Sequence, residues 1–136
     1  MDGKQYDLAG EVIGAAMKVH RILGPGFLEA VYANALSHEL KAQGVAFDRE
    51  QPLTVTYNGA VVGSYLADFV LGDSLIIEVK AISALAKAHE AQLVNYLAAT
   101  GIETGLLLNF GTSSLEFRRR QRTLRPPNSQ NSVNSV

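Results

Sequence analysis

The chain has 136 residues and a mass of 14.6 kDa, which is the size of one compact domain and leaves little room for a second core. Hydrophobic residues make up 47% and charged residues 18%, an ordinary globular composition that excludes a wholly disordered chain. No apolar run is long enough to cross a bilayer, no signal peptide is visible and there is no cysteine, so we expect a cytoplasmic protein that has no membrane contact, disulfide or thiolate metal site.

Charge is distributed unevenly along the chain. Residues 1–117 contain seven basic and thirteen acidic residues, a net charge of −6, whereas residues 118–136 contain five arginines and no acid. An acidic body with a basic tail is not the usual charge pattern of a fold that binds duplex nucleic acid. We expect one domain over 1–117, followed over 118–136 by a basic and then polar tail that is partly disordered. The tail arginines are interpreted either as solvated residues or as a phosphate-binding arm.

Two amphipathic helices are predicted at the start of the chain. Apolar residues recur at three- and four-residue steps from Tyr6 to Leu23, and Gly24-Pro25-Gly26 ends this segment. A second helix fits residues 27 to about 43, with Gly44 as its stop. On the apolar face of the first helix, His20 is interpreted as a core histidine rather than a metal ligand.

From Val45 onward the apolar period changes to that of β-strands. Alternation up to Tyr57 followed by Asn58-Gly59 predicts a tight hairpin. Further strands are predicted over residues 60–71, 75–80 and 104–110, with a third helix over residues 84–100 between the last two. This order predicts a mixed α/β fold, in which helices pack on one sheet.

Three ionisable residues interrupt the apolar strands. Glu78 and Lys80 project from the same face of one strand. If residues 72–74 form a three-residue loop, Leu71 pairs with Leu75 and Asp68 lies opposite Glu78, with Cβ atoms about 4.5–5.5 Å apart. Two carboxylates this close repel each other unless a cation lies between them, and Mg²⁺ prefers such oxygen ligands. Lys80 would then orient or deprotonate a water, or neutralise a phosphate.

A simpler interpretation of the same residues stays open. Glu78 or Asp68 forms an ordinary ion pair with Lys80 at a strand end. A two- or four-residue loop would place Asp68 opposite Ile77 and weaken the metal hypothesis.

Two helices present further polar residues in rows. His89, Gln92 and Tyr96 share one face of the third helix, where Gln92 would hold a phosphate or base and Tyr96 would stack. The alternative is a half-buried helix with a satisfied tyrosine. Glu29 and Tyr32 form a second pair near the start of the second helix, where Glu29 also complements the helix dipole.

Several motifs together resemble a known family. Residues 26–32 are similar to the G-x-x-E-x-x-Y signature of the GxxExxY family. Asp68 with Glu78-Val79-Lys80 resembles the D…(D/E)-x-K motif of the PD-(D/E)XK nuclease superfamily. Residues 89–96 resemble the Q-x-x-x-Y motif of its RecB-like branch, and residues 106–111 resemble its last core strand. The likeness extends in the same order from Tyr6 to Leu115.

The resemblance implies a restriction-endonuclease-like αβββαβ core with an extra N-terminal helix. It also implies that Asp68, Glu78 and the carbonyl of Val79 bind Mg²⁺ or Mn²⁺, that Lys80 positions the attacking water, and that Glu29 is an extra ligand or orients the base. The residues expected to brace the site are Gln92 and Tyr96, and those expected to contact nucleic acid are Tyr32, His89, Arg118, Arg119, Arg120 and Arg122.

One position departs from the family pattern. Leu66 stands two residues before Asp68, where family members usually have an arginine. The leading hypothesis is a Mg²⁺-dependent nuclease that cleaves DNA, with RNA less favoured. The alternatives are a catalytically weak or inactive module that binds nucleic acid or a partner protein, and a homodimer around the substrate.

Overall fold

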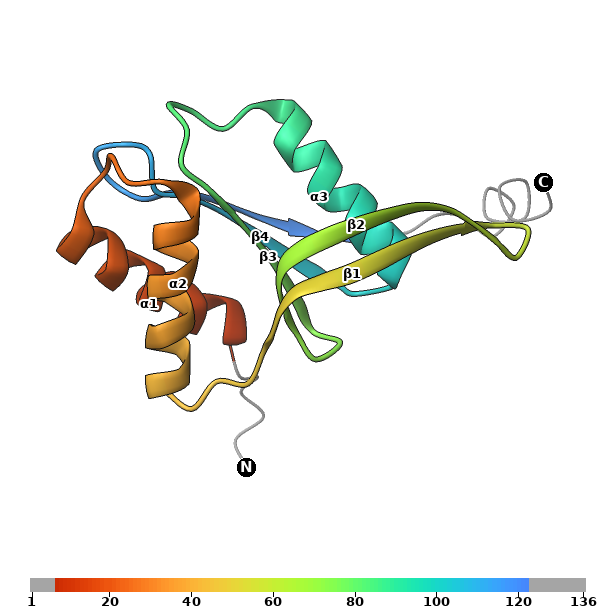
Figure 1. Cartoon of the computed structure of the whole chain (residues 1–136), viewed down its shortest axis with the longest axis horizontal. Coiled ribbons are helices and arrows are strands. Elements are labelled where there is room, and N and C mark those ends of the chain that lie inside the picture. Colours follow the sequence, from red (N-terminus) through yellow and green to blue (C-terminus); the bar gives the residue numbers. More distant parts are fainter. Residues whose placement is uncertain (1–6, 123–136) are drawn as a thin grey trace.

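The computed structural model describes residues 7–122 and contains three helices and five strands in that range. In chain order these are α1 (Leu8–Leu23), α2 (Glu29–Ala42), β1 (Asp48–Tyr57), β2 (Ala60–Leu71), β3 (Leu75–Lys80), α3 (Lys87–Thr100), β4 (Thr104–Asn109) and β5 (Glu116–Gln121). The mixed α/β fold with an αβββαβ core, preceded by an extra helix, is confirmed (Figure 1). Within residues 7–122, no helix combines the length and apolar character that a membrane span needs.

The five strands form one sheet in the order β1-β2-β3-β4-β5. Neighbouring strands are antiparallel except for β3 and β4, which are parallel and connected through α3. The Asn58-Gly59 turn joins Tyr57 to its partner Ala60, and both turn residues have positive φ, as a type I′ hairpin requires. The β2–β3 pairing sets Leu71 opposite Leu75, so the predicted three-residue loop and its register are confirmed.

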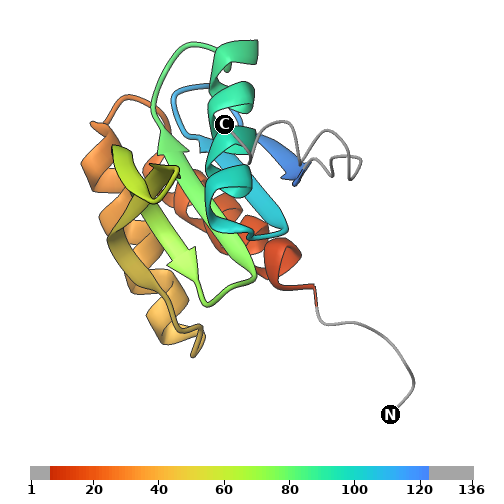
Figure 2. The ribbon, with the colours of Figure 1, turned by 90° about the vertical axis from the view of Figure 1, so that its right-hand side faces the viewer.

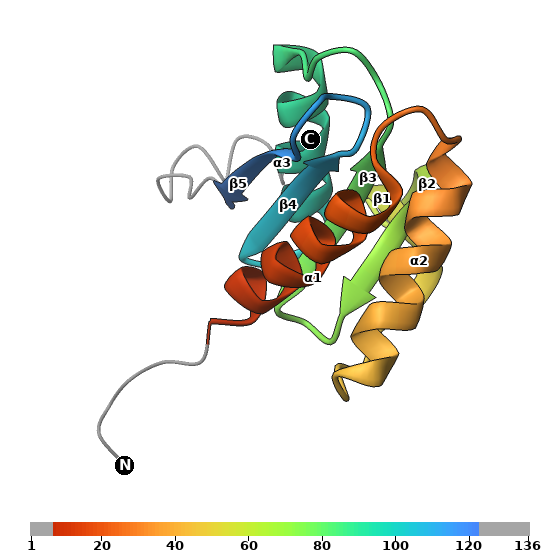
Figure 3. The same cartoon turned by 90° about the vertical axis from the view of Figure 1, so that its left-hand side faces the viewer.

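Helices cover both faces of the sheet. α1 and α2 pack together on one face (Figure 3), and α3 crosses the other (Figure 2). Alternate residues of β3 divide between the two cores: Ile77 and Val79 pack toward α1 and α2, whereas Ile76 packs with α3 residues such as Leu93. α3 comes so near to the sheet that a Cβ on Gly105 of β4 would lie 2.7 Å from the Leu93 side chain, so any larger residue there would displace Leu93.

The distal part of the β1–β2 hairpin extends beyond the rest of the sheet (Figure 1). Residues 51–67 contain no charged side chain. The exposed large apolar side chains of this segment are Tyr57, Val61, Val62, Tyr65 and Leu66. β1 forms one open edge of the sheet, and its pairing with β2 is interrupted by a register shift between Val55 and Thr56.

The strand β5 was not predicted. Residues 116–121 pair along the whole of β4, so the domain extends past the expected boundary at residue 117 and three of the arginines lie in a strand. The sequence of β5 has no apolar alternation because it is an open edge whose side chains are largely exposed. The remainder of the expected tail, residues 123–136, lies outside the described residues.

The helix starts differ slightly from those predicted. The first helix was expected from Tyr6, outside the described residues, and α1 begins after Asp7, which accepts a hydrogen bond from the Gly10 amide at 3.0 Å. α2 begins at Glu29 rather than residue 27, where the Phe27 amide is bound by the hydroxyl of Tyr32 of the same helix. α3 begins at Lys87 rather than residue 84, because Glu116 of β5 binds the Leu85 amide.

Candidate active site

The predicted acidic pair lies where the β2–β3 ladder ends. The last backbone pair of the ladder is Phe69 with Ile77, and beyond it side chains take over the hydrogen bonding. The Asp68 amide donates to Glu78 Oε2 at 3.0 Å, and the Val79 amide donates to Asp68 Oδ2 at 2.7 Å. Each carboxylate therefore bonds to the backbone of the opposing strand, which holds both acids at the same level of the sheet.

The regular alternation of β2 breaks at Asp68. Phe69 packs in the α1–α2 core, yet Ala67, which a regular strand would place on the same face, packs with α3. On the neighbouring strand, Glu50 has a positive φ of 50° at the level of Asp68, and the two residues do not pair. The distortion is consistent with a bend in the β1–β2 hairpin at the position of the acid.

Burial makes the acidic pair electrostatically unfavourable. Glu78 is only 7% exposed. Loss of hydration, together with the nearby Asp68 carboxylate, raises the pKa of Glu78 to about 8. Desolvation also raises the pKa of Asp68, while the hydrogen bond from Val79 and the charge of Lys80 oppose that rise. Among residues 7–122, the side chains around Asp68 and Glu78 thus compensate the negative charge of the two carboxylates only in part.

Lys80 and Glu29 complete the charged cluster. Lys80 is half-buried two residues beyond Glu78, and its charge acts on all three acids. Glu29 is the first residue of α2, and its pKa is raised by partial burial and by the Asp68 carboxylate. The fold thus brings Glu29, which is distant in the sequence, into electrostatic range of the two strand acids.

Two tyrosines border the cluster on the α3 side. Tyr96 is buried, and its ring lies against that of Tyr65 in β2 with centroids 5.0 Å apart. Desolvation and the charge of Glu78 raise the pKa of Tyr96 above its ordinary value. Gln92, one turn earlier on α3, is exposed. Tyr96 therefore fits the predicted bracing role better than a direct stacking role.

The donor set fits a hard divalent cation. Asp68 and Glu78 offer carboxylate oxygens, and Mg²⁺ is commonly held by one or two carboxylates together with waters. Their unfavourable burial is the kind that a cation relieves. Among residues 7–122, no group of three or more His, Cys, Asp or Glu side chains is close enough to form an all-protein metal cage. The residues present thus suit a site with two carboxylates and open positions for water and substrate.

Tyr32 does not occupy the position expected for a nucleic-acid contact. Its side chain is fully buried. The hydroxyl donates to the Gly24 carbonyl at 2.5 Å and accepts from the Phe27 amide at 3.1 Å. The prediction was wrong because spacing on a helix indicates a shared face but not which face is covered. His20 is a core histidine as expected, 6% exposed, with Nε2 2.8 Å from the Thr112 carbonyl.

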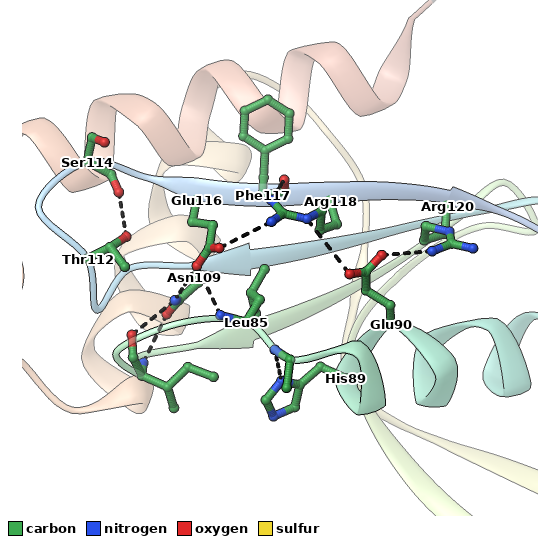
Figure 4. A network of polar contacts seen from close by, with 12 residues as sticks. Leu85, His89, Glu90, Asn109, Thr112, Ser114, Glu116, Phe117, Arg118 and Arg120 are labelled. Atoms are coloured by element: carbon green, nitrogen blue, oxygen red, sulfur yellow. Dashed lines mark hydrogen bonds and ion pairs between the residues drawn. The ribbon is translucent and has the colours of Figure 1, made fainter.

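A polar network that the sequence analysis missed fixes the loop between β3 and α3 (Figure 4). Asn109 is fully buried and bonds to both the amide and the carbonyl of Ile82, at 2.9 and 3.0 Å. Glu116 accepts from the Asn109 side chain at 3.0 Å and from the Leu85 amide at 3.1 Å. The only signal in the sequence is a polar residue near the end of an apolar strand. The network sets the direction in which the chain leaves Lys80.

His89 is likewise used within the fold. Its Nδ1 accepts a hydrogen bond from the Ala86 amide at 2.9 Å, which satisfies a free donor at the start of α3 (Figure 4). The side chain is half-buried, so part of the ring remains accessible to a ligand.

The predicted nucleic-acid-binding arginines form surface ion pairs. Arg118 and Arg120 point to the α3 side, where both contact Glu90, at 3.8 and 2.7 Å (Figure 4). Arg119 lies on the opposite face and contacts Asp7 at 3.3 Å, while Arg122 pairs with Glu103. Such exposed pairs contribute little to stability, so little is lost when an arginine exchanges its partner for another anion.

Comparison with known proteins identifies the superfamily. Residues 6–120 match the PD-(D/E)XK nuclease superfamily, and the chain therefore belongs to it. Two solved structures are similar to the chain at 14% identity and a TM-score of 0.46. The protein SSO0001 is matched over 95% of this chain and 86% of that chain, and an alkaline exonuclease (LHK-Exo) from Laribacter hongkongensis over 96% and 77%. No curated protein matches the sequence.

Proposed function

We propose that this protein is a Mg²⁺-dependent nuclease that hydrolyses phosphodiester bonds in DNA, with RNA the less favoured substrate. The main supporting observation is the crossed pair of hydrogen bonds that holds Asp68 and Glu78 against opposite strands, two residues from Lys80. Membership of a nuclease superfamily supports the same reaction class. Within it, we assign the chain to the GxxExxY family and to the RecB-like branch on residues 26–32 and 92–96.

In the proposed mechanism, Asp68, Glu78 and the Val79 carbonyl hold the divalent cation, for which Mn²⁺ can substitute. When bound, the cation polarises the phosphate and lowers the pKa of a water. Lys80 positions that water for in-line attack on phosphorus and takes part in its deprotonation. Glu29 adds negative charge at the helix side of the site, and Tyr96 with Gln92 braces the other side.

The proposed substrate contacts lie beyond the cluster. Leu66, which is 62% exposed, occupies the position at which family members usually have an arginine, whose side chain would bind the substrate phosphate. We assign that role to Arg118 and Arg120, with His89 and Gln92 on α3 as further contacts. The same gap favours a second candidate function, a catalytically weak module that binds nucleic acid or a partner protein. A homodimer in the cytoplasm would fit either function.

A metal-binding experiment tests the proposal first. Thermal unfolding is measured with and without millimolar Mn²⁺ for wild type, Asp68→Asn and the matched control Asp73→Asn, which alters an exposed acid in the adjoining loop. Saturation at about a hundred times Kd stabilises a protein by about 2.7 kcal/mol. We expect a rise of several degrees in wild type and Asp73→Asn and none in Asp68→Asn.

Cleavage of labelled single- and double-stranded DNA and RNA is then compared for the same three proteins. We expect Mn²⁺- or Mg²⁺-dependent cleavage of DNA by wild type and Asp73→Asn only. Equal cleavage by Asp68→Asn would refute the assigned site. Metal binding without any cleavage would favour the catalytically weak module.

A further inference from the structure

The cap of α2 does not by itself fix the position of Glu29 relative to Asp68 and Glu78. Glu29 opens α2, and the preceding residue, Leu28, provides no side-chain cap for the helix. The loop before it contains Gly24 and Gly26, with φ of 69° and 114°. Glycine adopts these positive φ values readily, and it leaves the backbone of the loop free to take other conformations. Some other contact must therefore fix where this helix begins.

Tyr32 supplies that contact at both ends of the loop. Its hydroxyl donates to the carbonyl of Gly24, at the end of α1, and accepts from the amide of Phe27, two residues before Glu29. The Phe27 ring also packs edge-on against the Tyr32 ring, with centroids 6.1 Å apart. One buried hydroxyl thus closes the loop that leads to Glu29.

The Tyr32 ring is in turn held by Phe110, the residue that follows β4. It stacks on Phe110 with centroids 4.8 Å apart and planes inclined by 12°. The Phe110 amide donates to the carbonyl of Lys80 at 2.8 Å. The His20 ring also lies on Phe110, with centroids 6.2 Å apart, and His20 is itself bonded to Thr112. The aromatic stack therefore connects the start of α2 to the end of β3.

We propose that Tyr32 is a positioning residue that fixes the start of α2, keeps Glu29 within electrostatic range of Asp68 and Lys80, and thereby sets the affinity of the site for its divalent cation. This inference rests on the proposed metal site. It assigns Tyr32 no contact with substrate, in keeping with its complete burial. The two hydrogen bonds of its hydroxyl act through the loop, and the ring acts through the stack on Phe110.

A double-mutant cycle tests the connection between Tyr32 and Glu29. Mn²⁺ affinity is measured by titration calorimetry for wild type, Tyr32→Phe, Glu29→Gln and the double variant, at a temperature well below every Tm. Tyr32→Phe removes the hydroxyl but keeps the stacked ring, and Tyr57→Phe, which alters an exposed tyrosine on the hairpin, is the matched control. The loss of two hydrogen bonds is expected to weaken Mn²⁺ binding about 3- to 10-fold in Tyr32→Phe and not in Tyr57→Phe.

The cycle separates positioning from general structural support. If Tyr32 acts through Glu29, Tyr32→Phe has no further effect on Mn²⁺ affinity in the Glu29→Gln background. Additive effects of the two substitutions, or an unchanged Mn²⁺ affinity in Tyr32→Phe, would overturn the inference. If wild type binds Mn²⁺ in the same experiment, the proposed metal site itself still stands. No Mn²⁺ binding by wild type would instead overturn the proposed function and this inference with it. Should Tyr32→Phe unfold at the assay temperature, Phe110→Leu replaces it in the same cycle, with the same coupling expected.

Discussion

The two faces of the sheet differ in chemistry as well as in cover. On the α1–α2 face, a large hydrophobic cluster joins the helices to the strands. On the α3 face, the apolar cluster is smaller, and this is the face from which Glu78 and Lys80 project. A single helix, α3, crosses this face (Figure 2), and Glu78 and Lys80 project from the same side of β3 as Ile76, which packs with α3. One face therefore supplies most of the stability, and the other bears the cost of buried charge.

The largest expected effect concerns Lys80, on the α3 face. Lys80→Met should lower the rate of metal-dependent cleavage about 1,000-fold, equivalent to about 4 kcal/mol, because the group that positions the attacking water and helps to remove its proton is lost. Mn²⁺ affinity should stay equal or increase, because a positive charge near the acids is removed. Single-turnover cleavage and calorimetry on the same samples check both parts. Loss of metal binding would indicate that Lys80 supports the site rather than the chemistry.

The opposite face should respond in stability alone. Leu36 of α2 is fully buried in the α1–α2 cluster, so Leu36→Ala should lower the free energy of unfolding by about 3 kcal/mol through lost burial and the cavity left behind. Urea unfolding measures the change, and cleavage per folded molecule should be nearly unchanged. A matching loss of activity at low temperature would show that the two faces are not independent.

The cost of the buried acids should appear as a pH dependence. In EDTA, folded Glu78 keeps its proton up to a pKa of about 8, whereas an ordinary glutamate releases it near 4.5. Between these values the folded state binds more protons, so stability falls as pH rises from about 5 to 8, by about 3 kcal/mol. Urea unfolding at several pH values should show this fall in wild type and in Glu103→Gln, an exposed-residue control, but a much smaller fall in Glu78→Gln. A stability that instead rises over this range would contradict the assigned pKa.

The smallest effect distinguishes the arginines of β5 by face. Arg120→Ala, on the α3 face, should weaken binding of a labelled DNA about fivefold and reduce its salt dependence by about one phosphate contact. Arg119→Ala, on the α1 face, should leave both unchanged. Fluorescence anisotropy in a Lys80→Met background, in which the strand is not cut, measures the difference. Equal losses in the two variants would indicate a nonspecific effect of net charge.

The sequence predicted the parts of the fold that local patterns determine. β2 and β3 have the expected bounds, and the three-residue loop sets the register that aligns Asp68 with Glu78. Alternation and turn residues suffice there because both strands are central and their loop is short. The acidic pair could be predicted from the same register, because a carboxylate in a buried strand is costly unless a partner or a cation compensates its charge.

The parts that were missed depend on contacts between distant segments. β5 has no apolar alternation, and only its pairing with β4 identifies it. The start of α3 is delayed because Glu116, far along the chain, binds the Leu85 amide. Tyr32 was expected to contact nucleic acid because no local pattern indicates that Phe110 stacks on its ring and helps to bury it. Gly111 belongs to the same class, since a Cβ there would collide with the backbone of Ile82.

The uncharged hairpin has a consequence for how the protein behaves in concentrated solution. Natural sheets commonly protect an open edge with charged side chains, and β1 has such residues only at positions 48–50; over residues 51–57 it has instead Pro52 and the irregular pairing near Val55. Over residues 51–57, therefore, only backbone shape opposes the addition of strands from neighbouring molecules. A lysine at Val61 or Val62, both exposed and distant from Glu78 in the sequence, is the natural change for a preparation that must remain monodisperse.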